Sequence, residues 1–254
     1  MANEQHVRMV KWQRDEWNAW REQHRDVIPD LRGANLAGVD LHELNLKGAL
    51  LGEANLRNAN LRAANLAGAD LSKASVYGAD LRDAKLAGAN LRGLNVKVRM
   101  SPQKMILDGA DLSQAELAGA YLNGASLRNA NLSDSDLTGA CLKDGDLQKA
   151  NLSRAKLCQA NLNLALLNDA RLTDSDLTGA NLSAAGLSGT KLEGVRMHGT
   201  ILRLVDLAGV AIDAGALCQA DLRGAVLSHG QQFQVLLGKA MRLGRLLRRE
   251  SCAA

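Results

Sequence analysis

The stretch ANLRNANLRAANLAGADL, from Ala54 to Leu71, decides the fold of this 254-residue chain. Leu recurs at every fifth position, Ala stands two residues before each Leu, and Asn or Asp stands directly before it. A period of five fits neither standard element, because it scatters the leucines around an α-helix and alternates them between the faces of a flat strand. If each five-residue unit forms one short side and then turns a corner, every Leu and Ala can point inward. The stretch therefore predicts a coil.

The same period runs through most of the chain. A large aliphatic residue occupies every fifth position from Leu31 to Val96, and the series resumes one residue out of phase at Leu107 and continues to Leu227. This makes roughly 39 units, which would stack about 4.8 Å apart from coil to coil. We predict an all-β solenoid, a right-handed quadrilateral parallel β-helix with an α-helical cap at each end.

A heptapeptide that occurs twice in the sequence favours four sides per coil. The heptapeptide DSDLTGA occurs at Asp134–Ala140 and again at Asp174–Ala180, 40 residues apart, which is a multiple of twenty and not of fifteen. A four-sided coil stacks both copies on one face, with Arg154 and Lys156 between them and Arg196 one coil further. Opposite charges would then alternate along that face, and we interpret this as a solvated ladder that helps to hold the stacking register.

The ends of a solenoid carry unpaired strand edges and exposed Leu, so each end needs a cover. Residues 4–26 are expected to form an N-terminal helix with Val10, Trp17 and Trp20 as its apolar side chains, and Pro29 blocks its continuation. The predicted segments are a capping helix at 1–29, coils at 30–96, a loop or bulge at 97–106, coils at 107–229 and an amphipathic basic helix at 230–254.

The interruption KVRMSPQKMI, Lys97–Ile106, is the first candidate contact site, because the Leu phase slips there and Pro102 appears. Insertions in solenoids lie on the surface, and Met adapts to partners, so we expect exposed side chains in this loop. The alternative is a tolerated insertion without function. The candidate residues are Arg99, Met100, Ser101, Pro102, Gln103, Lys104 and Met105.

The C-terminal helix is the second candidate. Its apolar residues share one face, and its basic residues lie largely elsewhere. It could cap the last coil or join two copies in a homodimer, and contact with a membrane surface or nucleic acid has less support. Just before it, bulkier residues at inward positions between Val195 and Gly215 suggest a locally wider coil. The candidate cap or dimer residues are Phe233, Leu236, Ala240, Leu243 and Leu247.

Composition excludes several classes of function. Aromatic residues make up only 2% of the chain, so the interior must be built from Leu and Ala. No apolar stretch reaches the length of a membrane span and no secretory signal opens the chain, so we expect a cytoplasmic protein without stable membrane insertion. The four cysteines and five histidines are dispersed and no catalytic motif occurs, so we expect no disulfide, metal, cofactor or enzyme activity. The net charge of +4 comes from the C-terminal segment, since residues 31–229 carry about 21 basic and about 20 acidic side chains.

These units resemble the pentapeptide-repeat family, and so does the opening, in which Trp17, Asn18, Trp20 and Arg21 precede Pro-Asp-Leu. Some members of that family protect type II topoisomerases, DNA gyrase especially, against quinolones or peptide-like poisons, with rods that mimic duplex DNA. The resemblance implies a protein partner such as gyrase or topoisomerase IV. The nearly neutral body departs from the acidic mimics, so a loop would have to supply specificity. The alternative is a general interaction protein or structural scaffold with another partner, and we expect no direct binding of nucleic acid.

Overall fold

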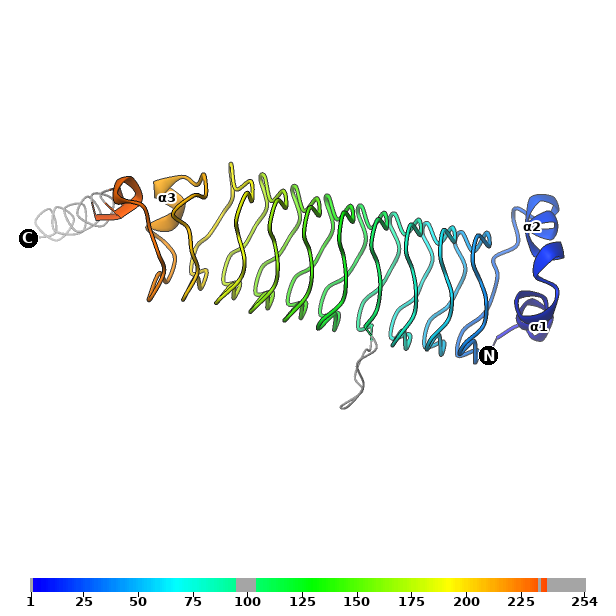
Figure 1. The fold of residues 1–254 in the computed structure, drawn as a ribbon. Helices are drawn as coiled ribbons and strands as arrows, with labels where there is room; N and C mark the ends of the chain where they lie inside the picture. The colour runs from blue at the N-terminus through cyan, green and yellow to red at the C-terminus, as the bar shows by residue number, and fades with distance from the viewer. Residues whose placement is uncertain (1, 95–103, 233, 237–254) are drawn as a thin grey trace, which may run out of the picture.

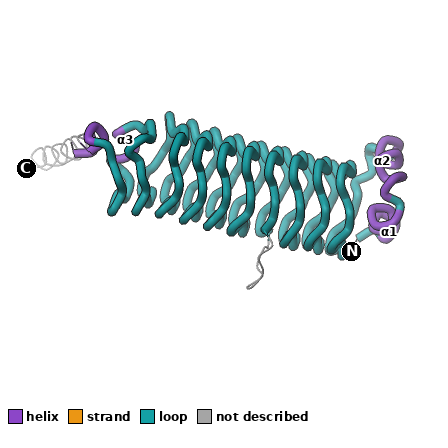
Figure 2. Tube along the Cα trace, in the orientation of Figure 1, coloured by secondary structure: helices purple, strands orange, loops and turns teal. Residues whose placement is uncertain are grey.

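The chain winds into a long rod of stacked coils (Figure 1). The computed structural model describes residues 2–94, 104–232 and 234–236. Parallel β-bridges join residues that are twenty apart in sequence, as in the series Asn35, Asn55 and Ser75. Twenty residues make four five-residue sides, so the predicted solenoid with four sides per coil is confirmed. Its right-handed sense stays a prediction. Each side contributes a single bridge, which is why the body appears as loop in Figure 2.

The interior of the rod consists of aliphatic side chains in columns. Leu56 and Leu61 are fully buried, and so is Ala64, two residues before the next Leu. Burying each Leu stabilises the fold by about 1.5–3 kcal/mol relative to exposing it. Ala fills this inward place in most units because it packs closely beside Leu, whereas Leu44 fills the same place in one unit.

The corner of each coil explains the Asn or Asp before each Leu. The side-chain oxygen of Asn55 accepts a hydrogen bond from the N–H of Arg57 at 3.3 Å, which caps the turn. The next residue, Asn58, has φ +56°. Gly38 holds the same place one coil earlier with φ +68°, and glycine is favoured there because it takes this conformation without strain.

Two helices, not one, lie at the N-terminal end of the rod (Figure 1). α1 spans Glu4–Trp12 and α2 spans Arg14–Gln23, so the prediction of a single helix over 4–26 was wrong. The break falls at Gln13, whose φ of −126° leaves the helical range. Trp17 is fully buried, and its indole N–H donates to the carbonyl of Asn45 in the first coil at 3.0 Å.

The interruption of the repeat leaves the coil intact. Asp80 bridges Ile106, a step of 26 residues instead of twenty, so six extra residues are accommodated without breaking the ladder. The N–H of Leu81 still donates to the carbonyl of Ile106 at 2.7 Å. Lys104 is exposed, as predicted. Met105 is buried, so the prediction that Met105 is exposed was wrong. Met105 stands two residues before Leu107 and therefore takes the inward place that Ala holds in other units.

The coils separate near the C-terminal end. Among the described residues, three sides lack their bridges at one step, whereas Ile201 and Asp221 remain bridged on the fourth side. The short helix α3, Ala214–Leu217, occupies part of this opening, and the sequence did not predict it. Valines replace Ala in the inward column near this opening, but they do not explain it by themselves, since Leu44 holds the same place in a coil that keeps its Asn45–Asn65 bridge. The valines are Val195, Val205 and Val210; the missing bridges are Gly186–Asp206, Lys191–Ala211 and Arg196–Ala216.

The C-terminal helical segment is described over residues 229–232 and 234–236. Val235 is buried, whereas the predicted contact residue Leu236 is 67% exposed. Leu236 therefore does not take part in covering the last coil. The other four residues of that predicted face, Phe233, Ala240, Leu243 and Leu247, lie outside the described residues.

Candidate functional site

The first candidate site is the interruption. Five of its seven predicted contact residues, 99–103, lie outside the described residues, and Met105 belongs to the core. Lys104 is the described candidate with an exposed side chain. Both described flanks of the interruption are held in the ladder, because the N–H of Tyr121 donates to the Leu94 carbonyl at 3.2 Å and the N–H of Ile106 donates to the Ala79 carbonyl at 3.1 Å.

The second candidate is a face of alternating charge. Asp136, Lys156, Asp176 and Arg196 bridge one another in that order, so the stacking predicted from the repeated heptapeptide is confirmed. Arg196 approaches Asp176 with 3.5 Å between Nε and Oδ2.

At the adjoining corner, Arg154 donates two hydrogen bonds of 2.7 and 2.6 Å to the carboxylate of Asp134. Both side chains are exposed, so the pair contributes little to stability and mainly favours this register. The hydrogen bonds from Arg154 also hold the pKa of Asp134 below its ordinary value.

The carboxylates of the face stay ionised for a second reason. Burial alone would raise the pKa of Asp176, but hydrogen bonds from Thr178 and Cys158 and the charge of Arg196 together outweigh it, and the pKa lies below its ordinary value. The N–H of Thr178 donates to Asp176 at 3.0 Å. The alternation of charge is therefore maintained at neutral pH.

An exposed apolar corner is a feature that the sequence analysis did not single out. Leu164 and Leu166 flank one corner and are 46% and 43% exposed. Leu204 stands two coils further in the column of Leu164 and is 71% exposed. The signal was available, because all three leucines fall outside the inward positions of the repeat. Exposed apolar groups of this kind are typical of contact surfaces for proteins.

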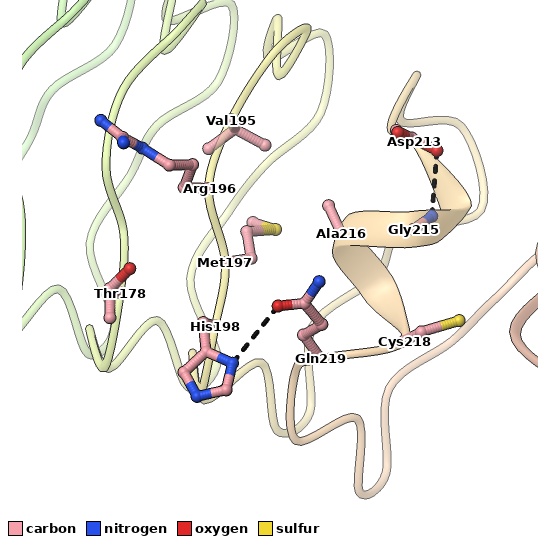
Figure 3. A pocket seen from close by; sticks show the side chains of 10 residues that line it. All are labelled: Thr178, Val195, Arg196, Met197, His198, Asp213, Gly215, Ala216, Cys218 and Gln219. Carbon is pink, nitrogen blue, oxygen red and sulfur yellow. Dashed lines mark hydrogen bonds between the residues drawn. The ribbon is translucent and has the colours of Figure 1, made fainter. Parts of the chain in front are cut away.

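A cavity of about 550 Å³ lies where the coils separate (Figure 3). Val195, Arg196 and Met197 form its floor, and α3 forms the opposite wall. The Nδ1–H of His198 donates a 3.3 Å hydrogen bond to Oε1 of Gln219, which ties the two walls together at one end. Asp213 turns its carboxylate toward the N–H of Gly215, which donates to it at 2.9 Å. The predicted widening between Val195 and Gly215 thus corresponds to a cavity and not to a broader coil.

Groups with catalytic or metal-binding chemistry are scattered. Among the described residues, no cluster of three or more His, Cys, Asp or Glu side chains could hold a metal ion. No disulfide joins the three described cysteines, and burial raises the pKa of the Cys158 thiol. None of the described helices is long and apolar enough to cross a membrane.

Comparison with known proteins identifies the repeat. The profile of the pentapeptide repeats family matches in eight copies, over residues 30–52, 54–93, 106–144, 146–183 and 180–213. No curated protein matches the sequence significantly.

Several solved structures are similar. HetL, a pentapeptide repeat protein involved in heterocyst differentiation regulation in the cyanobacterium Nostoc sp. strain PCC 7120, is 34% identical over 66% of this chain and 84% of its own, with a TM-score of 0.26. QnrB1, a plasmid-mediated fluoroquinolone resistance protein, is 17% identical over 80% of this chain and 98% of its own, with a TM-score of 0.44. A pentapeptide repeat protein of the Arabidopsis thaliana thylakoid lumen is 28% identical over 51% of this chain and 86% of its own, with a TM-score of 0.27.

The matched repeats cover more than half of the chain, and their boundaries agree with the coils and with the interruption after residue 94. The chain belongs to the pentapeptide-repeat family.

Proposed function

We propose that this chain is a non-catalytic, cytoplasmic binding protein that protects a type II topoisomerase, DNA gyrase or topoisomerase IV, from an inhibitor by direct binding. The observation that carries the proposal is the six-residue excess in the coil between Asp80 and Ile106. Six residues added to a coil that keeps its ladder can change in sequence without disturbing the core, which suits a recognition site. We name topoisomerases as the partners because the sequence resembles protective members of the family.

The test is a gyrase supercoiling assay with the purified chain titrated in, with and without a quinolone or an albicidin-like peptide. Topoisomerase IV decatenation is the parallel assay. The intact chain should restore supercoiling in the presence of the drug. If no poison and neither enzyme responds, the protection proposal fails.

A matched deletion locates the site. Removing residues 98–103 joins Lys97 to Lys104 and spaces Val96 and Leu107 five residues apart, so the repeat becomes continuous. Lys104 then takes the corner place that Lys73 already occupies with φ +57°. The deletion variant should lose the protection while the exchange-protected N–H of the ladder shows an intact rod. Equal protection by the variant would exclude the loop as the contact.

The second candidate function is a general protein-interaction or structural scaffold, which the exposed apolar corner favours. Leu164→Ser with Leu204→Ser removes most of that corner without touching the core. If this variant and not the deletion loses binding to a topoisomerase, the corner is the contact. If the topoisomerase does not bind at all, the corner becomes the surface with which to search for another partner.

Self-association is a further part of the proposal. The exposed Leu236 at the C-terminal end suits a homodimer joined through residues 230–254. Sedimentation of the chain and of Leu236→Glu tests it, since a dimer should dissociate at lower dilution in the variant. A monomer at all concentrations would exclude the dimer.

A further inference from the structure

One rung of the parallel ladder is missing beside α3. In the coils below, the N–H of Leu177 donates to the carbonyl of Arg196 at 2.8 Å, and the N–H of Arg196 donates to Ser175 at 3.0 Å. By the same pattern Ala216 should accept from Met197 and donate to Val195. Its N–H instead bonds Asp213 at 3.1 Å inside α3.

The floor of the cavity therefore offers one backbone donor and one backbone acceptor. Among the described residues, no backbone group bonds the N–H of Met197 or the carbonyl of Val195. These are the two groups that any residue adding to this edge would use. Unpaired backbone groups are costly when dehydrated, so a ligand that enters must supply both partners.

The size of the cavity fits a short segment of extended chain. Its volume of about 550 Å³ lies within the usual range for ligand pockets of about 300–1,000 Å³. In Figure 3 the strand of Val195 to His198 and the helix α3 stand apart, with Met197 between them. Met197 is 2% exposed as a residue, and its sulfur lies on the side that faces α3 (Figure 3).

The charge at this open edge of the ladder favours an acidic side chain on the bound peptide. Along the alternating face, Lys156 lies between two carboxylates, Asp136 and Asp176, in the bridge series. Arg196 ends that series and has a carboxylate on one side only, that of Asp176 at 3.5 Å. Its side chain is 73% exposed, so it is accessible to an anion on the side away from Asp176. Asp213, the acidic residue of the cavity wall, is engaged by the N–H of Gly215.

We propose that this cavity binds an extended peptide segment of a protein partner, which adds to the rod as one further rung. The peptide donates its N–H to Val195 and accepts from Met197, and an acidic side chain at the same residue lies over Arg196. The proposal needs a protein partner but does not depend on that partner being a topoisomerase, so either proposal can fail alone.

The first measurement is amide hydrogen exchange by NMR on the intact protein. The N–H of Met197 should exchange much faster than that of Leu177, which is bonded within the ladder. Equal protection of the two would mean that the rung is closed in solution, and it would overturn the proposal.

The second measurement uses Ac-Ala-Asp-Ala-NH2 as the probe and Ac-Ala-Lys-Ala-NH2 as its match. The acidic peptide should shift the amide resonances of Val195 to His198, slow the exchange of Met197 and bind about two- to fivefold more tightly than the basic one. A peptide with N-methyl aspartate, which cannot donate to Val195, should bind more weakly. Shifts centred elsewhere, no binding, or equal binding of all three peptides would overturn the proposal.

Two variants and one small anion distinguish the contribution of backbone hydrogen bonds to binding from the contribution of charge. Arg196→Glu should reverse the preference toward the basic peptide, whereas Lys156→Gln, in the same column with its rungs filled, should leave it unchanged. A loss of preference in both variants would contradict the assignment to Arg196. If acetate alone gives the same shifts as the acidic peptide, the cavity is an anion site and the added rung is excluded.

Discussion

Two serines in the inward Ala column provide a matched test of polar burial in the rod. Ser135 and Ser175 occupy the same place in the two DSDLTGA copies, and both are fully buried. The hydroxyl of Ser135 donates to the carbonyl of Leu132 at 2.7 Å, whereas the Ser175 Oγ makes no hydrogen bond to any described residue. We expect Ser175→Ala to stabilise the rod and Ser135→Ala to destabilise it slightly.

The magnitudes follow from these contacts. Removing an unbonded buried hydroxyl relieves a dehydration cost of about 1–3 kcal/mol, while the satisfied hydroxyl contributes about 0.5–1.5 kcal/mol net. The loss at Ser135 should lie at the low end, because its own N–H continues to bond the Leu132 carbonyl at 3.3 Å. The two variants should therefore differ by about 2 kcal/mol in the free energy of opening the local coil.

Native-state hydrogen exchange is the appropriate assay, because coils contact only their neighbours and can open separately. The reporters are the ladder N–H groups of Asp136 and Asp176, which bond Ala115 and Ala155 at 3.0 Å. Slower exchange at Asp176 in Ser175→Ala is the expected result. If Ser175→Ala costs as much as Ser135→Ala, both hydroxyls are bonded in solution and the reasoning is refuted.

Two further predictions concern the N-terminal helices. Trp17→Ala should cost about 3–5 kcal/mol and expose the amides of the first coil to exchange, because the indole is fully buried; Trp12→Ala, at a side chain 73% exposed, should leave them protected. Burial, with a smaller contribution from Arg21, lowers the pKa of His6 below 6.5 against the opposing charge of Asp30. The contribution of neutral His6 is therefore complete above pH 6.5 and is lost as the pH falls through the lowered pKa, so acid should loosen the helices. In His6→Gln this pH dependence should disappear, and its persistence would assign it to another group.

The repeat was readable because each five-residue unit places its Leu and the residue two before it inside the lumen. Position in the five-residue unit therefore told which side chains are buried, and Met105 could have been assigned to the core by the same rule. The place of Met105 in a loop suggests an exposed side chain, but its position relative to Leu107 correctly indicates that it is buried.

The parts that escaped prediction depend on three-dimensional packing. Residues 211–217 keep the phase of the repeat, yet 214–217 form α3, in which the N–H of Ala216 bonds the Asp213 carbonyl instead of the ladder. The hydrogen bond from Trp17 to the carbonyl of Asn45, 28 residues away, is likewise a contact that no local propensity reports. The cavity and its unpaired edge could not be inferred, since a missing bond leaves no mark on the period.

The direction of the hydrogen bonds between coils has a mechanical consequence. These bonds run along the rod, so a force applied at its two ends loads them in series and peels coils apart one at a time, without the resistance of strands sheared side by side. Each twenty-residue coil should lengthen the chain by about 65 Å as it yields. The first coils to separate should be those at the step where Ile201 and Asp221 form the remaining bridge. Under tension this step should be the weakest point of the described rod.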